Sequence, residues 1–398
     1  MEIFMNSLEE AKSLKSYMVS LRNYFHSHPE LGLHEFNTCK KIQEELDKDG
    51  IRNYRVKETN VIAELDTGKP GKTLFLRADI DALPIQEAND VPYKSQNSGV
   101  MHACGHDGHT AYMLGTARLI QKHLSELSGK VIIAFQAAEE IGRGARDIIA
   151  AGVLDKVDRC FGIHFQAGMD VGKVGIKSGA DMASCDHFLI KITGRAGHIT
   201  APQKCVDSLF IATQIATQLQ TVVSRLISPV EGALIGIGRI QSGTTYNIIP
   251  GSAELEGTIR SFTAESRKKL YTAVTKIAGN VADEYGGKAD VLIEDICDPC
   301  FNDEKATAEA VESCIKVAGK ENTLTNIEKR FMSDNFADYF RKVPGCYAHV
   351  GSSDSEATRW PHHNEHFDLA EDSTVYAAAL ALQYTLDYLG DKIGEKSC

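Results

Sequence analysis

The stretch TLFLRADIDALP, residues 73–84, contains the first of the chemically informative strands. Its first six residues form a short and largely apolar run, and the carboxylates of Asp79 and Asp81 follow this run. A short apolar run that ends in polar residues predicts a β-strand. The fold class then depends on what lies between this strand and its neighbours.

Further strands alternate with helices on both sides of this stretch. We expect strands at residues 60–65, 130–136 and 160–164, and helices at 110–123 and 145–151. An N-terminal amphipathic helix, with apolar residues from Ala11 to Phe25 at helical spacing, is expected to end near His28-Pro29. This alternation predicts an α/β domain with a mostly parallel sheet.

The pattern changes near residue 185. Strands are expected at 186–193, 233–240, 253–262 and 289–294, with long helices at 207–226 and 264–285. The order β-α-β-β-α-β is that of the split, ferredoxin-like unit. A chain of 398 residues exceeds the usual size of one core. We therefore expect a domain at 185–295 inserted into a larger one formed by 1–184 and 296–398.

Composition excludes several classes of partner. The formal charge of −11 argues against nucleic acid and against anionic membrane surfaces. The ten cysteines are scattered, as in proteins of a reducing cytosol, and the single C-x-x-C of Cys297 and Cys300 is interpreted as chance. Neither a signal peptide nor a membrane span is evident, so a cytoplasmic protein is expected.

The stretch MHACGHDGH, residues 101–109, carries the chemistry. Cys104 and His106 point the same way if the backbone is extended, and both are metal ligands once deprotonated. His102 and His109 flank them. A buried cysteine beside ordinary histidines explains one Cys-x-His motif equally well, so the rest of the chain must decide.

Other polar groups follow the predicted strands. Ligands of open α/β sheets bind outside the carboxyl ends of the strands. Such ends lead into Asp79 and Asp81, into Glu139 and Glu140, and into His164, while HHNEHFD near the C-terminus supplies His362, His363 and His366. Each group alone has an ordinary structural explanation, but their convergence favours a metal site.

The number of donors indicates two metals. Cys104, His106, Glu140, His164 and one C-terminal histidine make five protein ligands, whereas a single catalytic zinc takes three and a water. Five donors suit a pair of ions about 3.5–4 Å apart. Glu139 precedes a ligand, which suits a general base that deprotonates water and later protonates the leaving amine.

These residues resemble those of a known family. The chain is similar to the amidohydrolase branch of the dinuclear metallo-carboxypeptidase and aminoacylase family, which includes hippurate hydrolases, N-acyl-amino-acid amidohydrolases and indoleacetyl-amino-acid hydrolases. The matching stretches cover nearly the whole chain: FHSHPELGLHE (25–35), RADIDALP, MHACGHDGHTA, FQAAEEIGRGA, GIHF, GRAGHITAP, NIIPGSAELEGTIRSF and HNEHFDLAEDS.

The resemblance implies a site and a fold. The fold is a metallo-aminopeptidase/carboxypeptidase-like catalytic domain with an inserted ferredoxin-like lid, through which relatives often form homodimers. Two metal ions are implied at Cys104, His106, Glu140, His164 and His363, where His363 stands four residues before Phe367 as in the family pattern. Glu139 would be the base, Asp81 and Asp79 would support the ligands, His198 would polarise the scissile carbonyl, and Asn247 and Arg260 would bind the substrate carboxylate.

The implied reaction is metal-dependent hydrolysis of the amide bond of an N-acyl amino acid. Manganese or zinc, or else cobalt or nickel, would serve as the metal. The chain departs from the family pattern at Ala137 and Glu365, where proline is usual, at Gln203, where a second histidine is common, and at Asp334-Asn335-Phe336. The alternatives are a hydrolase with Cys104 as nucleophile and a metal- or ligand-binding protein without catalysis.

Overall fold

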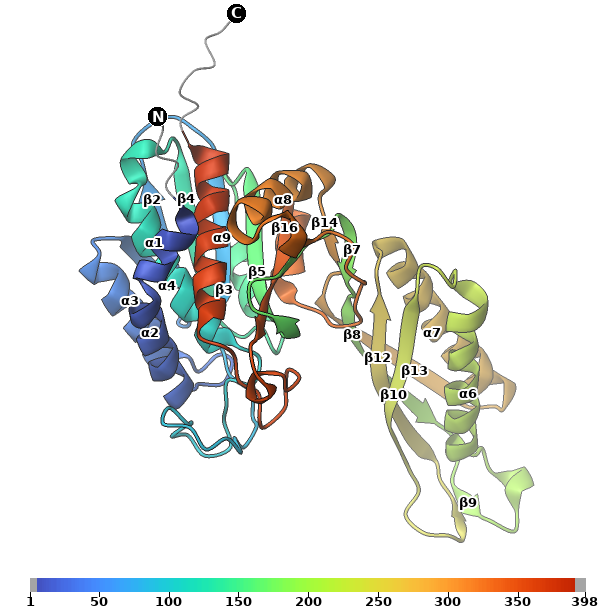
Figure 1. The fold of residues 1–398 in the computed structure, drawn as a ribbon. Coiled ribbons are helices and arrows are strands. Elements are labelled where there is room, and N and C mark those ends of the chain that lie inside the picture. Colours follow the sequence, from blue (N-terminus) through green and yellow to red (C-terminus); the bar gives the residue numbers. More distant parts are fainter. Residues whose placement is uncertain (1–5, 391–398) are drawn as a thin grey trace, which may run out of the picture. The chain divides into compact units, whose positions relative to one another are not determined.

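A computed structural model describes residues 6–390 and divides the chain into two compact units (Figure 1). Within the described residues, unit 1 comprises 6–179, 302–328 and 334–390. Unit 2 comprises residues 180–301 and 329–333. Unit 2 thus begins five residues before the boundary expected at 185 and ends its main part six residues after the one expected at 295.

Unit 1 is built on an eight-stranded sheet with a parallel centre. The four central strands β4, β3, β5 and β16 run parallel, and antiparallel strands extend the sheet on both sides. The predicted fold class, with its mostly parallel sheet, is confirmed. In spatial order the strands are β1 (Arg52–Val56), β2 (Asn60–Asp66), β4 (Lys130–Gln136), β3 (Thr73–Asp79), β5 (Arg159–Asp170), β16 (Gly345–Ser353), β6 (Val174–Gly175) and β15 (Thr323–Leu324).

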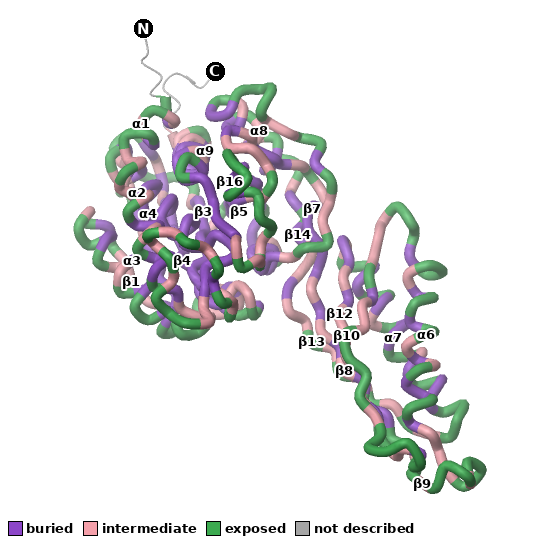
Figure 2. Tube along the Cα trace, turned by 60° about the horizontal axis from the view of Figure 1, so that its bottom comes forward, coloured by how far each residue is buried: buried purple, intermediate pink, exposed green. Residues whose placement is uncertain are grey.

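Helices cover the central strands and enclose the main core. Alternate residues of β3 serve its two faces: Leu74 and Leu76 join the helix-covered core, whereas the ring of Phe75 packs 4.8 Å from that of Tyr339 in a 3₁₀ helix, η4 (Asn335–Arg341). Figure 2 shows the buried strands at the centre of this unit. The helices are α1 (Ser7–Ser13), α2 (Lys15–Ser27), α3 (Phe36–Lys48), α4 (His106–Lys122), α5 (Gly144–Ala150), α8 (Glu304–Ala318) and α9 (Asp372–Leu389).

Unit 2 has the predicted β-α-β-β-α-β order. Its antiparallel sheet has the spatial order β10-β12-β8-β13, and α6 and α7 contribute a second core with the strands. Asp207 caps α6 by accepting the Phe210 N–H at 3.1 Å. The elements are β8 (Cys185–Thr193), α6 (Ser208–Leu226), β10 (Ala233–Ser242), β12 (Ser252–Ser261), α7 (Ala264–Glu284) and β13 (Lys288–Cys297), with short pairs of β9 (Gly197–His198) with β11 (Ile248–Ile249) and of β7 (Gly179–Met182) with β14 (Cys300–Asn302).

Two local expectations were wrong. The N-terminal helix is two helices that break at Leu14, because α1 packs on α9 whereas α2 packs on α4. Cys104 and His106 do not share an extended segment, since α4 already begins at His106 and Gly105 precedes it with a φ of 89°. Glycine adopts that backbone conformation at little cost, which lets the chain turn sharply between the two residues.

Among residues 6–390, the helices are too short or too polar to cross a lipid bilayer.

Candidate metal centre

The candidate centre lies where the parallel strands β4 and β3 of unit 1 end, beside the middle of β5. Neighbouring strands β4, β3 and β5 bring together the residues that follow Gln136, those around Asp79 and the middle of β5. His164 lies within β5, which continues to Asp170, and not at the strand end that the sequence indicated. The neighbouring parallel strands explain how residues from distant parts of the chain meet.

Cys104 and His106 enter this region from the start of α4. The His106 ring donates from Nδ1 to the backbone oxygen of Asp81 at 2.9 Å, which directs Nε2 towards the other candidate ligands. The close approach of β5 to α4 needs Gly108, because a Cβ there would lie 2.7 Å from the Phe165 ring. Packing against β5 thus positions both donors.

The five expected ligands form one connected cluster. The ligand atoms of Cys104, His106 and Glu140 all lie within 4.8 Å of one another. Cys104 Sγ lies 3.6 Å from His164 Nε2, and His363 Nε2 lies 3.4 Å from Glu140 Oε2. The donors come from the bend before α4 and its first residue, from the turn after β4, from β5 and from the segment before α9.

Unpaired buried atoms show that this cluster fits a cation. His106 Nε2 and Glu140 Oε1 are buried, lie 3.9 Å apart and have no hydrogen-bond partner among the described residues. Buried polar atoms are rarely left unpaired, so two that face each other are typical of a metal position. A thiolate, imidazoles and a carboxylate together suit a transition metal or zinc.

Glu139 lies beside the cluster in a setting that suits a base. Its Oε1 accepts the backbone N–H of Asn335 at 3.1 Å. Burial, together with the carboxylates of Asp334 and Glu140, raises the pKa of Glu139 well above its usual value. A carboxylate whose proton affinity is raised in this way is suited to accept a proton.

Asp81 and Asp79 hold the surrounding backbone and side chains. Asp81 accepts the backbone N–H groups of Glu139 and Glu140 at 3.0 and 3.1 Å. Asp79 accepts from Arg77 at 2.6 Å and from His109 Nδ1 at 2.5 Å. Donor atoms of Asp79, His106, His109 and His164 also lie within 4.8 Å of one another, a grouping that the sequence analysis did not indicate.

The two adjacent histidines His362 and His363 have different surroundings. His362 Nε2 accepts the backbone N–H of Ala167 at 3.2 Å, so in the neutral ring the proton is on Nδ1, which lies 3.9 Å from Cys104 Sγ. His363 Nε2 instead faces Glu140. His366 lies away from these contacts and stacks on Trp360, with ring centroids 5.1 Å apart. His363 therefore stays the proposed ligand.

Three predicted substrate residues belong to unit 2. His198 is an exposed residue of β9, and its Nδ1 accepts from the backbone N–H and hydroxyl of Thr200 at 3.2 and 2.8 Å, which leaves Nε2 available. The backbone oxygen of Asn247 accepts the Ile199 N–H at 3.2 Å. Arg260 donates to the Ser333 hydroxyl at 2.8 Å.

Two residues that support the site were missed by the sequence analysis. Asn335 donates its N–H to Glu139, and Glu35 accepts the N–H of Ala138 at 2.7 Å. Glu35 ends the stretch FHSHPELGLHE, and Asn335 lies in one of the departures from the family pattern. Those positions were the available signal, but neither residue type by itself indicates such a role.

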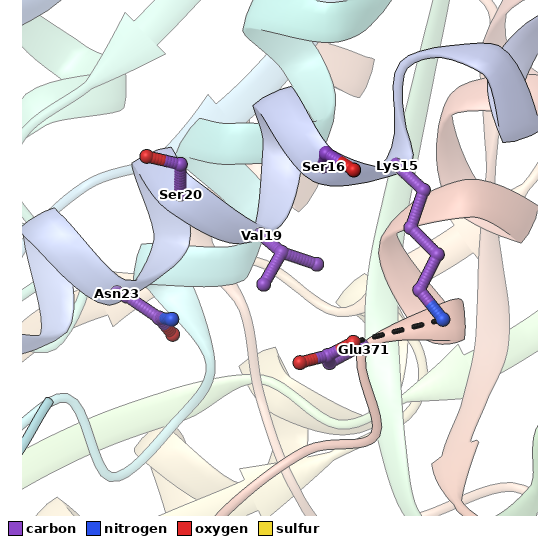
Figure 3. A pocket seen from close by; sticks show the side chains of 6 residues that line it. All are labelled: Lys15, Ser16, Val19, Ser20, Asn23 and Glu371. Carbon is purple, nitrogen blue, oxygen red and sulfur yellow. Dashed lines mark ion pairs between the residues drawn. The ribbon is translucent and has the colours of Figure 1, made fainter. Parts of the chain in front are cut away.

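A surface cavity of about 440 Å³ lies elsewhere, on the outer side of α2 (Figure 3). Its lining is mostly polar, and Lys15 pairs with Glu371 across it at 3.6 Å. None of its lining residues is a candidate site residue. This cavity therefore contributes nothing to the chemistry of the cluster.

The α/β sheet with its cluster of metal-ligand types, together with the ferredoxin-like unit, defines the class of protein. A protein-family model described as peptidase family M20/M25/M40 matches residues 75–387. The chain belongs to this family. It is a hydrolase, as the sequence led us to expect, and the predicted resemblance to the amidohydrolase branch is confirmed.

Individual relatives agree with this assignment. An N-acetylcysteine deacetylase from Bacillus subtilis (strain 168) is 38% identical over 369 residues, which are 92% of this chain and 95% of the relative. A thermostable carboxypeptidase 2 from Saccharolobus solfataricus is 37% identical over 372 residues, 91% of this chain and 93% of the relative. The solved structure of the Bacillus subtilis YXEP protein, described as a dinuclear metal binding peptidase from the M20 family, has 35% identity and a TM-score of 0.81 and covers 93% and 98% of the two chains.

Proposed function

We propose that the protein hydrolyses the amide bond of N-acyl amino acids with the help of two divalent metal ions. The observation that carries this proposal is the position of Glu139. Its carboxylate is adjacent in sequence to Glu140, whose buried Oε1 and the Nε2 of His106 have no hydrogen-bond partner among residues 6–390. A site that only bound metal would need Glu140 as a ligand, but it would not need the additional carboxylate of Glu139.

We infer that Cys104, His106, Glu140, His164 and His363 hold the metals. When bound, such ions lower the pKa of water towards ~7 and polarise the amide carbonyl. Manganese and zinc are the first candidates, and cobalt or nickel would suit the same donors. The neutral ring of His164 fits this role, because burial and the neighbouring histidines lower its pKa well below the usual value.

Glu139 then acts as general base and later as general acid. Its carboxylate takes a proton from the attacking water, and the same proton goes to the leaving amine when the tetrahedral intermediate collapses. The hydrogen bond from the Asn335 N–H holds Oε1, so the proton would be taken on Oε2. Asp81 keeps the carboxylate in place through the backbone of residues 139 and 140.

The residues of unit 2 would complete the site around the substrate. His198 has one ring nitrogen available and would stabilise the oxyanion. Asn247 and Arg260 would bind the substrate carboxylate, for which a guanidinium group has the right geometry. This assignment makes unit 2 a lid, and we propose that the protein also forms a homodimer through it. Cys39, Cys160, Cys314 and Cys346 are buried free thiols, which supports the proposal of a cytoplasmic location.

The experiment is a substrate panel with metal-loaded and chelator-treated protein. N-acetyl, N-benzoyl and indoleacetyl amino acids and short peptides are incubated with the manganese and zinc forms, and amine release is measured. We expect release from at least one acylated amino acid and its loss after chelation. Hydrolysis of peptides alone would contradict the substrate class, and no hydrolysis of any amide would favour a binding protein.

The same panel separates the rival in which Cys104 is the nucleophile. That mechanism predicts activity that survives chelation and is abolished by alkylation of Cys104. Burial and the Glu140 carboxylate hold the pKa of the Cys104 thiol well above its usual value. Nucleophilic cysteines instead have lowered pKa values, and Cys104 lies within the candidate ligand cluster, so we favour the role of a ligand over that of a nucleophile.

A further inference from the structure

The turn that carries Glu139 and Glu140 has an unusual backbone. Ala138, the residue before Glu139, has a φ of 53°, a left-handed conformation that residues with a side chain seldom adopt. Two backbone bonds close the turn on one side: Gly142 N–H to Glu139 O at 2.9 Å and Arg143 N–H to Ala138 O at 3.0 Å. The conformation of Ala138 sets the direction in which the next side chain, that of the proposed base, leaves the backbone.

Two carboxylates capture three successive N–H groups of this turn. Asp81 binds those of Glu139 and Glu140, and Glu35 binds that of Ala138 at 2.7 Å. The hydrogen bond to Glu35 is the shortest of the three, and its donor is Ala138, the residue with the strained conformation. Strained backbone persists only where its surroundings hold it. Glu35 is therefore the acceptor placed to hold Ala138.

Glu35 is built into this position. It is fully buried, lies just before α3, and comes from a segment so close to the turn that a Cβ on Gly32 would lie 3.2 Å from Ala138 Cα. Burial and the charge of Asp81 raise the pKa of Glu35 to about 8. Its second oxygen, Oε2, is buried without a hydrogen-bond partner among the described residues. The raised pKa indicates a neutral side chain at pH 7, which a glutamine would imitate.

We propose that Glu35 is a positioning residue for Glu139, which it orients by accepting the N–H of Ala138. The inference rests on the proposed function, because it assumes that Glu139 is the base. The hydrogen bond that the Glu35 side chain accepts comes from the backbone of Ala138 and not from a candidate ligand. Its loss should therefore slow the chemical step and leave substrate binding and metal content largely unchanged.

The variants are Glu35→Met, which removes the acceptor, and Glu35→Gln, which keeps an acceptor oxygen without a charge. Glu30→Met is the matched control. Glu30 lies in the same segment and accepts the backbone N–H groups of Asn37 and Thr38 at 3.2 and 2.8 Å, away from the turn. Each variant is loaded with manganese, its metal content is measured, and kcat and KM are determined separately on the best substrate of the panel.

We expect kcat of Glu35→Met to fall on the order of 10- to 100-fold with KM nearly unchanged, because a misplaced base costs about that much. Glu35→Gln should restore most of kcat, and Glu30→Met should keep it. Equal kcat values in Glu35→Met and Glu30→Met, loss of metal in Glu35→Met, or failure of glutamine to restore kcat would each overturn the proposal.

Amide hydrogen exchange gives a readout that is independent of activity. In the protein without added metal, exchange in a peptide spanning residues 136–143 should accelerate in Glu35→Met but not in Glu35→Gln, whereas Glu30→Met should accelerate exchange near residues 36–40. Unchanged exchange at 136–143 in Glu35→Met overturns the proposal. If wild-type protein hydrolyses no substrate, the proposed function fails, and the exchange data still show whether Glu35 holds the turn.

Discussion

At the scale of single residues, the site depends on carboxylates whose partners are backbone N–H groups. The sequence could indicate Cys104, His106 and Glu140 as metal ligands, because these residue types bind metals and occur in recognisable stretches. It could not nominate Glu35, because its partner Ala138 lies 103 residues away and any residue offers a backbone N–H. A role that depends on an N–H group leaves no residue-type signal at the partner position.

Arg77 is the clearest residue for a test of stability. It is fully buried and binds Asp79 at 2.6 Å, Asp334 at 2.9 Å and the Asn335 side chain at 3.1 Å. Replacing it by methionine leaves two buried carboxylates without their cation, which typically costs ~3–5 kcal/mol. We expect Arg77→Met to lower the free energy of unfolding in urea by that amount.

The control for Arg77 is Arg118→Met. Arg118 pairs with Asp49 at 2.8 Å but is partly exposed, and surface pairs contribute up to ~1 kcal/mol. Equal losses of unfolding free energy in the two variants would contradict the view that the buried Arg77 organises the segment around Asp334 and Asn335. This segment includes the Asn335 N–H that binds Glu139.

At the scale of elements, the strands and helices named from the sequence are present, but several long elements of unit 1 were not named: α3, α8, α9 and the central strand β16. The strand expected at 130–136 is β4 with the same limits, and α6 begins one residue after the start expected at 207. The two-residue strands β6 and β15 were missed, because strands this short depend on pairing with their neighbours: β15 pairs with β6, and β6 also pairs with β16. The early start of α4 was missed because it depends on the conformation of Gly105.

A buried ionic network joins three of these elements. Arg22 and His26 of α2 both bind Asp107 in the first turn of α4, each at 2.8 Å, and Arg22 also binds Asp368 at 2.6 Å in the segment that carries His363. Burial opposes the charge of Asp107, but Arg22 and His26 outweigh it and hold the pKa of Asp107 far below its usual value. The network thus anchors α4 directly beside His106.

The network predicts a pH-dependent contribution to stability. In the unfolded chain Asp107 would titrate near its ordinary pKa of ~4, so the stabilisation is complete above that pH and is lost as pH falls below it. We expect Asp107→Asn to lower the free energy of unfolding by about 3 kcal/mol at pH 7. The difference from wild type should shrink steadily between pH 5 and pH 3.

Urea unfolding at several pH values measures this difference, and Asp372→Asn serves as the control. Asp372 pairs with Lys15 at 2.7 Å on the surface, so its replacement should cost less than ~1 kcal/mol at pH 7. A loss in Asp107→Asn that stays constant down to pH 3 would show that the charge of Asp107 is not what stabilises the fold.

At the scale of the whole molecule, the proposed site residues are distributed over both units. Unit 1 holds the five proposed ligands and the base, whereas His198, Asn247 and Arg260 belong to unit 2. The β-α-β-β-α-β order of unit 2 could be predicted because each element is long and regular. The segment 329–333 also belongs to unit 2. No local sequence pattern indicates this, because the assignment depends on the segment's tertiary contacts with the rest of unit 2.

Glu139 is proposed as the base and Glu140 as a ligand, although they are neighbours with the same side chain. Turnover and metal content are measured together in Glu139→Gln and Glu140→Gln, each loaded with manganese. We predict that Glu139→Gln keeps about two ions per chain, as in a dinuclear site, and loses nearly all turnover, whereas Glu140→Gln loses metal as well. Near-native turnover in Glu139→Gln would contradict the assignment of Glu139 as the general base.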